Sequence, residues 1–192
     1  MGSRLPRVSS SALSKIIIGG LGPGDGDLVS GAALELARTH PTFLRTREHP
    51  CAGMFDDLDS FDHLYESQQS LADVYEAIVE RLVGESIKRG TIGYLVPGSP
   101  LIAERTVDLL RQREEVSVEI LPGVSFLDLV WERLRVDPIA RRVTIVDGQR
   151  FETEVIGLAG PFLVAQCDSK FVLSDIKLSI DIQAPPKVTV LQ

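Results

Sequence analysis

The sequence predicts an α/β fold with a largely parallel sheet, followed by a second and smaller α/β domain. Three times before Asp137, a short apolar run leads into a turn rich in glycine or proline and then into an apolar helical segment. Strands that alternate with helices in this way are typical of parallel sheets. After Asp137 the long helical segments end. We therefore expect an N-terminal domain over residues 15–118 and a C-terminal domain over 119–192.

Composition and charge exclude several classes of protein. The chain of 192 residues is 44% hydrophobic, which is enough for a core, and its net charge of −7 argues against a nucleic-acid partner held on a basic surface. No apolar run approaches the ~18 residues of a membrane span. The polar residues 1–14 lack the apolar segment of a signal peptide. We expect a cytoplasmic protein with a flexible leader over residues 1–14 and no membrane partner.

Cysteine and histidine are too few and too scattered to predict a disulfide framework or a metal site. The two cysteines, Cys51 and Cys167, are expected to be free thiols. The three histidines, His40, His49 and His63, show no metal-ligand spacing. We therefore expect no metal.

The first strand–turn–helix unit contains the strand Lys15–Ile18 and a loop with six glycines or prolines from Gly19 to Gly26. Glycine lets a ligand approach main-chain N–H groups with no Cβ in the way. A dinucleotide fingerprint does not fit, because Asp25 and Asp27 occupy the candidate third-glycine positions, and a P-loop would need lysine at position 25. The loop therefore predicts a site for something other than the phosphates of a nucleotide.

The next stretch predicts mostly scaffold: a helix over 28–38, a strand over 43–45 and an irregular acidic segment over 56–70. The clearest helix follows, because apolar residues from Leu71 to Ile87 recur at i, i+3, i+4 and i+7. Ser70 is its predicted N-cap, and Gly90 is expected to end it.

The second and third units each join a strand to a helix through a Pro-Gly turn. The second is the strand 91–96, the turn 97–100 and a helix over 101–113, with Ser99 as N-cap and Pro100 in the first turn. The third is the strand 117–121, the turn 122–125 and a helix over 126–134. Because ligands bind at the carboxyl ends of strands in open α/β sheets, we expect these turns to converge on one crevice.

The C-terminal domain is expected to contain shorter elements. They are strands over 142–146, 161–165 and 187–191, and a helix over 171–180.

The three turns carry the motifs GLGPGD, PGSPLIAERT and PGVSF. Together these resemble the tetrapyrrole methylases, S-adenosylmethionine-dependent enzymes that methylate corrin precursors. The segments LRTREHP, FDHLYE and SDIKL look most like the methylase-like domain associated with MazG-type nucleoside triphosphate pyrophosphohydrolases. The resemblance implies two α/β domains of the tetrapyrrole methylase type, with the cofactor cleft between them. It also implies a homodimer, and further strands after Val190, so the C-terminal domain is predicted to be incomplete.

The resemblance carries over contacts to S-adenosyl-L-methionine, namely Pro23, Gly98, Ser99, Ile102, Ser125, Phe126 and Gln166. Ser99 stands where corrin methylases and diphthine synthase usually have aspartate, so a negative charge near the sulfonium is missing.

Methyl transfer from a sulfonium is an in-line displacement in which the cofactor supplies the reactivity and the protein aligns donor and acceptor. No triad, metal cluster or paired carboxylate is needed, and the sequence suggests none. Asp25 or Asp27 is a candidate base, with turn formation as the simpler explanation for both. Arg45, Arg47 and Arg105 are candidates for pairing with acidic substituents such as propionates, with solvated surface positions as the alternative.

Three functions remain open at this point. The first is an S-adenosylmethionine-dependent methyltransferase that acts on a tetrapyrrole-like or other small acceptor. The second is a non-catalytic or regulatory cofactor-binding domain that partners a MazG-type pyrophosphohydrolase, because Ser99 replaces aspartate and no acceptor-activating residue is obvious. Protein methylation, as in diphthine synthase, is weaker because the PGSP and LRTREHP segments look less like that branch.

Overall fold

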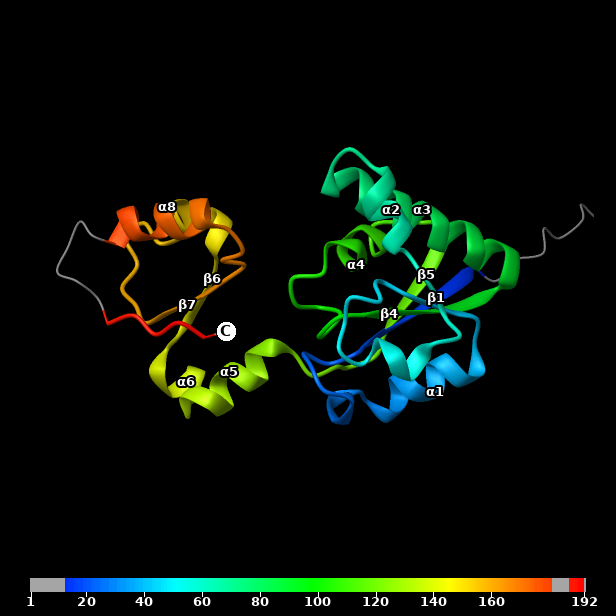
Figure 1. The fold of residues 1–192 in the computed structure, drawn as a ribbon, viewed down its shortest axis with the longest axis horizontal. Helices are drawn as coiled ribbons and strands as arrows, with labels where there is room; N and C mark the ends of the chain where they lie inside the picture. Colours follow the sequence, from blue (N-terminus) through cyan, green and yellow to red (C-terminus); the bar gives the residue numbers. More distant parts are fainter. Residues whose placement is uncertain (1–12, 181–186, 192) are drawn as a thin grey trace, which may run out of the picture. The chain divides into compact units, whose positions relative to one another are not determined.

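The structure is a computed structural model that describes residues 13–180 and 187–191. It divides into two compact units between Leu129 and Val130 (Figure 1). The leader expected over residues 1–14 lies outside the described residues, except for Leu13 and Ser14. Ser14 is already the first residue of strand β1.

The first unit is built on a five-stranded sheet with the strand order β3-β2-β4-β1-β5. The strands are β1 (Ser14–Gly20), β2 (Thr42–Leu44), β3 (Asp59–Ser60), β4 (Thr91–Val96) and β5 (Val116–Ile120). All neighbouring pairs are parallel. In the central pair, Lys15 lies opposite Thr91 and Gly20 opposite Val96. The two strands therefore end level, and the loops that follow them start side by side.

Helices cover both faces of this sheet, as Figure 1 shows, with α1 on one face and α3 with α4 on the other. The helical segments are η1 (Gly26–Leu28), α1 (Gly31–Thr39), η2 (Ala52–Phe55), α2 (Asp62–Ser67), α3 (Leu71–Arg89), α4 (Arg105–Leu110) and α5 (Phe126–Leu134). The last of these runs across the division between the units. A sheet covered on both faces explains why its strands read as continuous apolar runs.

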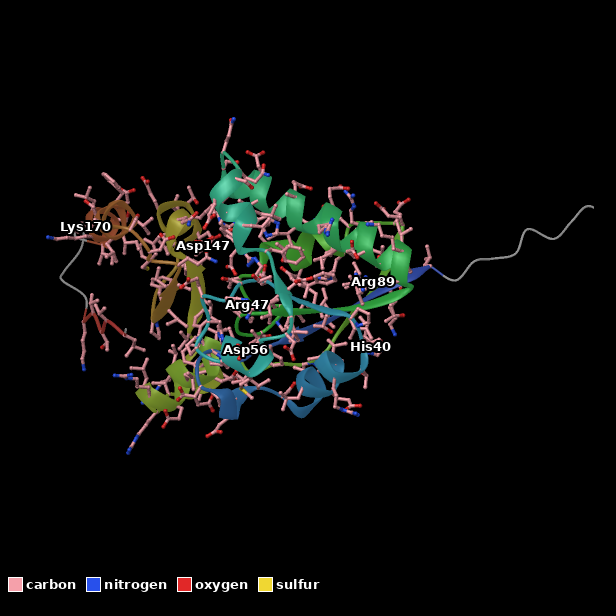
Figure 2. All side chains as sticks on the ribbon, turned by 45° about the vertical axis from the view of Figure 1, so that its right-hand side comes forward. His40, Arg47, Asp56, Arg89, Asp147 and Lys170 are labelled. Atoms are coloured by element: carbon pink, nitrogen blue, oxygen red, sulfur yellow. The ribbon has the colours of Figure 1, made fainter. Side chains whose placement is uncertain are left out.

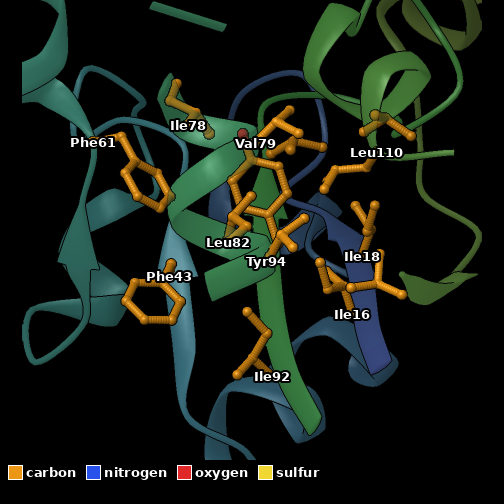
Figure 3. Close-up of a cluster of buried hydrophobic side chains, with 14 of the residues drawn as sticks. Ile16, Ile18, Phe43, Phe61, Ile78, Val79, Leu82, Ile92, Tyr94 and Leu110 are labelled. Atoms are coloured by element: carbon orange, nitrogen blue, oxygen red, sulfur yellow. The ribbon is translucent and has the colours of Figure 1, made fainter. Parts of the chain in front are cut away.

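The main core lies between the sheet and α3 (Figure 3). Ile16 and Ile18 of β1 and Tyr94 of β4 are fully buried against apolar side chains of α3, among them Ile78 and Leu82. The intervening Ile17 packs with the cluster on the α1 face. Each such side chain contributes roughly 1.5–3 kcal/mol to folding when it is fully buried. The core therefore holds the strands, and with them the loops at their ends, in fixed positions.

The second unit is a smaller α/β arrangement. Its two parallel strands are β6 (Thr144–Asp147) and β7 (Phe162–Ala165), and its helical segments are α6 (Pro138–Arg141), η3 (Gly148–Arg150), α7 (Phe151–Glu154) and α8 (Lys170–Ile180). Val146, Phe151 and Ile176 form its small buried core.

Several sequence-based expectations need correction. The helix expected over 101–113 begins only at Arg105, because Ala103 adopts a left-handed conformation with φ of 54°. Its N-cap is Glu104 and not Ser99. The segment 56–70 is not irregular, since it contains β3 and α2. Residues 187–191 form no strand.

The predicted boundary between residues 118 and 119 also differs from the division in the structure. It would cut β5, in which Glu119 pairs with Ile17 of β1. Because this pairing attaches β5 to the first sheet, the compact units divide eleven residues later, between Leu129 and Val130.

Candidate functional site

Two glycine loops are joined directly beyond the carboxyl ends of β1 and β4. The Gly22 N–H donates to the Gly98 carbonyl at 3.2 Å, and the Gly98 N–H donates to the Gly22 carbonyl at 2.9 Å. The φ angles of Gly22 and Gly98 are 74° and 64°, in the region that favours glycine. The GLGPGD and PGSP motifs are therefore two halves of one backbone arrangement.

The loop after β5 packs against the same place. The Leu121 N–H donates to the Ile18 carbonyl at 2.8 Å. A Cβ on Gly123 would lie 3.2 Å from the Cα of Gly20, and a Cβ on Gly20 would overlap the Gly98 carbonyl oxygen. The three loops thus pack backbone against backbone, so the expected convergence is confirmed within the first unit, while the crevice that they were expected to form stays a prediction.

Two glycines of the joined loops have open space beside them. A Cβ built on Gly24 or on Gly98 would meet no heavy atom within 4 Å. At these two positions there is therefore room that no neighbouring side chain fills. Close packing among the loops, together with open space at these two glycines, suits a ligand that is recognised mainly through the backbone.

A fourth segment, residues 45–55, reaches the loops from the end of β2, and we call it the cover segment. The Arg45 N–H donates to the Leu95 carbonyl at 2.8 Å, and His49 Nε2 lies 3.0 Å from the Gly22 carbonyl oxygen. Met54 Sδ would be 2.7 Å from a Cβ on Gly26. The sequence did not predict contacts between this segment and the glycine loops, because these contacts join residues far apart in the chain.

His49 and Cys51 form a close pair within the cover segment. Cys51 Sγ lies 3.1 Å from His49 Nδ1 and 3.5 Å from the Leu21 carbonyl oxygen. Burial lowers the pKa of His49 and raises the pKa of Cys51. Both shifts favour the uncharged forms, so the pair is a neutral imidazole beside a neutral thiol.

Arg45 and Glu104 form a buried ion pair next to the joined loops. Arg45 Nη1 lies 2.9 Å from Glu104 Oε2, and the two side chains are only 12% and 6% exposed. Burial disfavours the charged form of Arg45, but Glu104 together with the neighbouring tyrosines outweighs it, and the pKa of Arg45 is raised. The guanidinium also lies over the rings of Tyr65 and Tyr75, at 5.6 and 5.1 Å from their centroids. The charge of Arg45 is therefore already matched inside the protein.

Glu104 is held in turn by the start of α4. Its Oε1 accepts hydrogen bonds from the N–H and the hydroxyl of Thr106, at 3.1 and 2.7 Å. Because the Thr106 hydroxyl donates to Glu104, the Tyr94 hydroxyl, 3.0 Å away, donates to Thr106. This network ties the PGSPLIAERT segment to β4 and to the cover segment.

The other two arginines that were predicted to bind substrate have different surroundings. Arg47 Nη2 donates to the Asp56 carbonyl at 3.0 Å and also to the Leu58 carbonyl, so this side chain folds back on nearby backbone. Figure 2 shows Arg47 beside Asp56. Arg105 is exposed at the first position of α4.

The candidate catalytic aspartates are exposed and take part in a turn. The Asp25 carbonyl accepts the Leu28 N–H at 3.0 Å, which closes the short helix η1 that contains Asp27. The side chains of both aspartates are exposed. Turn formation accounts for their backbone positions, and a role as base stays a prediction.

Six of the seven predicted cofactor contacts lie on the three loops or at the start of α5. Pro23 follows Gly22, while Ser99 and Ile102 follow Gly98 and are joined by a hydrogen bond from the Ile102 N–H to the Ser99 carbonyl. Ser125 is buried, and its hydroxyl donates to Asp128 and accepts the Leu127 N–H. Ser125 therefore caps the helix that begins at Phe126.

Gln166, the seventh predicted contact, lies in the second unit directly after β7. It is exposed and has a φ of 57°, so the chain turns sharply at this residue.

A separate cavity of ≈ 640 Å³ lies beside the edge strand β3. Phe43, Phe61 and Leu64 provide apolar parts of its wall, and Asp59, His63 and Arg81 provide polar ones. None of its lining residues belongs to the three loops, so this cavity is not the predicted cofactor site.

Within residues 13–180 and 187–191, no group of three or more His, Cys, Asp or Glu side chains is placed to hold a metal ion. In the same part of the chain, no helix has the length and apolar character needed to cross a membrane.

Comparison with known proteins identifies the family. Residues 15–156 match the model of the Tetrapyrrole (Corrin/Porphyrin) Methylases. The chain belongs to this family. Its similarity to the uncharacterized protein YabN of Bacillus subtilis (strain 168) is 33% identity over 177 residues, which covers 86% of the chain. The match covers 35% of YabN, so the chain spans about a third of the length of this relative.

Solved structures support the fold of the tetrapyrrole methylase family. Uroporphyrin-III-C-methyltransferase from Thermus thermophilus matches with a TM-score of 0.56 and 19% identity, over 79% of this chain and 67% of that one. Precorrin-6Y methylase from Archaeoglobus fulgidus matches with a TM-score of 0.58 and 21% identity, over 80% of this chain and 73% of that one. At such identities the similarity demonstrates the fold and leaves the acceptor open.

Proposed function

We propose that this chain is an S-adenosylmethionine-dependent methyltransferase that acts on a tetrapyrrole-like or other small acceptor. The observation that carries the proposal is the reciprocal pair of hydrogen bonds between Gly22 and Gly98, which joins the GLGPGD and PGSP loops at the carboxyl edge of the sheet. In open α/β sheets this edge is where ligands bind. Membership of a methylase family supplies the reaction class.

The residues of the joined loops fit a cofactor that is held through main-chain groups. The open space at Gly24 and at Gly98 gives such a ligand room beside the backbone. When it is bound, S-adenosylmethionine supplies an activated methyl group, so the protein has to orient donor and acceptor and exclude water. The main core and the backbone contacts among the loops provide the rigidity that orientation requires.

The existing partners of the three candidate arginines indicate which of them is free to contact the acceptor. Arg45 is paired with Glu104, and Arg47 donates to backbone carbonyls of its own region. Arg105 is exposed at the start of α4, next to the PGSPLIAE segment. Among the three, we therefore assign contact with an acidic group of the acceptor to Arg105.

Calorimetric titration with S-adenosylhomocysteine tests the cofactor site. We expect saturable binding by the wild-type chain and its loss in Gly98→Ala, because a side chain is strained at a φ of 64°. Gly31→Ala is the matched control, since Gly31 is the first residue of α1 and a Cβ there meets nothing within 4 Å. The absence of heat at millimolar ligand with the wild-type chain would overturn the proposal.

A second candidate is a cofactor-binding domain that regulates a MazG-type pyrophosphohydrolase. It is favoured by the side chains near the loops, because His49 and Cys51 are paired with each other and Ser99 brings no charge. Cofactor binding without methylation of any corrin precursor, together with a ligand-dependent change in pyrophosphohydrolase activity, would favour this second function.

The homodimer and the cytoplasmic location also stay proposals. Light scattering of the purified chain tests whether it forms a homodimer.

A further inference from the structure

One carbonyl oxygen receives hydrogen bonds from two different segments of the first unit. The Gly22 oxygen accepts the Gly98 N–H at 2.9 Å and lies 3.0 Å from His49 Nε2. A carbonyl oxygen has two lone pairs, so both of its acceptor sites are used. The GLGPGD loop, the PGSP loop and the cover segment therefore meet at this atom.

The surroundings of His49 define which of its nitrogens carries the proton. A carbonyl oxygen only accepts, so Nε2 must donate to Gly22, and in the neutral ring Nδ1 then has a free lone pair. Cys51 Sγ lies 3.1 Å from Nδ1 and 3.5 Å from the Leu21 carbonyl oxygen. A thiol has one S–H to donate, and with Nε2 protonated Nδ1 is the nearer acceptor for it. The imidazole is thus held at both nitrogens, by a thiol that is only 3% exposed and by the loop carbonyl.

The cover segment is fastened by other contacts as well. The Arg45 N–H bonds to the Leu95 carbonyl, and the Arg45 side chain pairs with Glu104. The Ala52 N–H bonds to the His49 carbonyl at 2.9 Å and closes the local turn. These bonds do not use the imidazole ring. Removal of the ring therefore leaves the segment attached and changes mainly the bonding of the Gly22 carbonyl.

We propose that His49 is a positioning residue for the cofactor loops, which acts by fixing the Gly22 carbonyl through Nε2–H. The inference rests on the proposed function and adds to it a residue that belongs to none of the three motifs. Without the ring, the Gly22 carbonyl keeps only the Gly98 donor, and the GLGPGD loop gains freedom. Part of the binding free energy is then used to order the loop, so the affinity for the ligand decreases.

Three histidine variants test the proposal in calorimetric titrations with S-adenosylhomocysteine. We expect His49→Ala to weaken binding by about three- to tenfold, as for the loss of one hydrogen bond. His49→Gln should restore binding to within about twofold of wild type, because its side-chain amide can donate in place of Nε2–H. His40→Ala is the matched control, since His40 is half-buried at the end of α1, where its Nδ1 lies 2.8 Å from the Thr39 hydroxyl, and this variant should bind as the wild type does.

A second pair of variants tests the contact between Cys51 and Nδ1 of the ring. This pair also tests the proposal if His49→Ala does not fold. Cys51→Ser keeps a donor for Nδ1 and should retain affinity, whereas Cys51→Val removes the donor at similar volume and should weaken binding. Equal affinity of His49→Ala and wild type would overturn the inference, and so would failure of His49→Gln or Cys51→Ser to bind better than its partner variant. If the wild-type chain itself binds no ligand, the proposed function falls and the inference falls with it.

Discussion

The two units use the same kinds of element in different ways. In the first unit, five parallel strands are covered on both faces, and the loops after β1, β4 and β5 are packed backbone against backbone. The described residues of the second unit form two strands, and Ile145 of β6 is 51% exposed. The first unit thus combines a large buried core with closely packed loops. The second unit has a smaller core and exposes more apolar side chains. The first unit therefore carries the structural case for a cofactor site.

The largest predicted difference is in the loss of stability when a buried or an exposed ion pair is removed. Glu104→Ala leaves Arg45 without its partner in a buried place and should lower the free energy of unfolding by about 3–5 kcal/mol. Arg150→Ala removes exposed pairs with Asp147 and Glu154 in the second unit and should cost less than about 1 kcal/mol. Urea denaturation of both variants measures the difference, and similar losses would contradict the buried network.

Two glycine substitutions compare close packing in the first unit with open space in the second. Gly20→Ala would bring a methyl group against the Gly98 carbonyl oxygen, so we expect a loss of about 1–3 kcal/mol and no binding of S-adenosylhomocysteine. Gly157→Ala has open space around its Cβ but a φ of 73°, so only backbone strain of roughly 1–2 kcal/mol is expected. Thermal unfolding and calorimetry measure both effects. Intact ligand binding by Gly20→Ala would contradict the packing of the loops.

The pH dependence of stability should also distinguish the units, since all three histidines lie in the first. Burial lowers the folded-state pKa of His49 below its ordinary value of 6.5. Between these two pKa values the unfolded chain binds more protons than the folded chain, so stability decreases as pH falls. The part of the free energy of unfolding that depends on uncharged His49 is fully present above a pH of about 6.5. It is lost as the pH falls through the folded-state pKa of His49.

Urea midpoints at pH 7.5, 6.5 and 5.5 measure this contribution. The urea midpoint of His49→Gln should decrease less between pH 6.5 and 5.5 than the midpoint of the wild type. An identical decrease would show that His49 is not the group responsible.

Asp62 contributes to the pH dependence of stability at lower pH. Burial opposes its charged form, but hydrogen bonds from Thr46, Ser60 and Arg47 outweigh this effect and lower its pKa, so its contribution disappears only in more acidic solution.

The smallest predicted effect is an increase in affinity. Ser99→Asp would place a negative charge on the PGSP loop, where the resemblance to corrin methylases predicts aspartate, and should tighten binding of S-adenosylmethionine by a few-fold, or about 1 kcal/mol. Ser99→Asn is the neutral control of similar size. Calorimetry that shows the same affinity for both variants would exclude a role for charge at position 99.

The sequence predicted the elements that have a strong local pattern. Strand β4 occupies the predicted residues 91–96, and α3 begins after the predicted cap Ser70 because its apolar stripe is long and regular. The convergence of the loops was predictable because glycine and proline mark the carboxyl ends of the parallel strands. The late start of α4 was not predictable, since it depends on the left-handed conformation of Ala103.

The surroundings of the site residues depend on contacts between distant parts of the chain. Arg45 meets Glu104 across 59 positions, and His49 meets Gly22 across 27. Neither pair has a local spacing that reveals it. For this reason the sequence identified Arg45 as a substrate contact and gave His49 no role at the site, while the fold places both beside the glycine loops.

A crystal structure of the chain with S-adenosylhomocysteine tests the central claim most directly. The account predicts that the ligand contacts main-chain atoms of the GLGPGD and PGSP loops on the open side of Gly24 and Gly98, with the Gly22–Gly98 hydrogen bonds intact. Ligand density in the cavity beside Phe43 and Phe61, or separation of the two loops around the ligand, would contradict it.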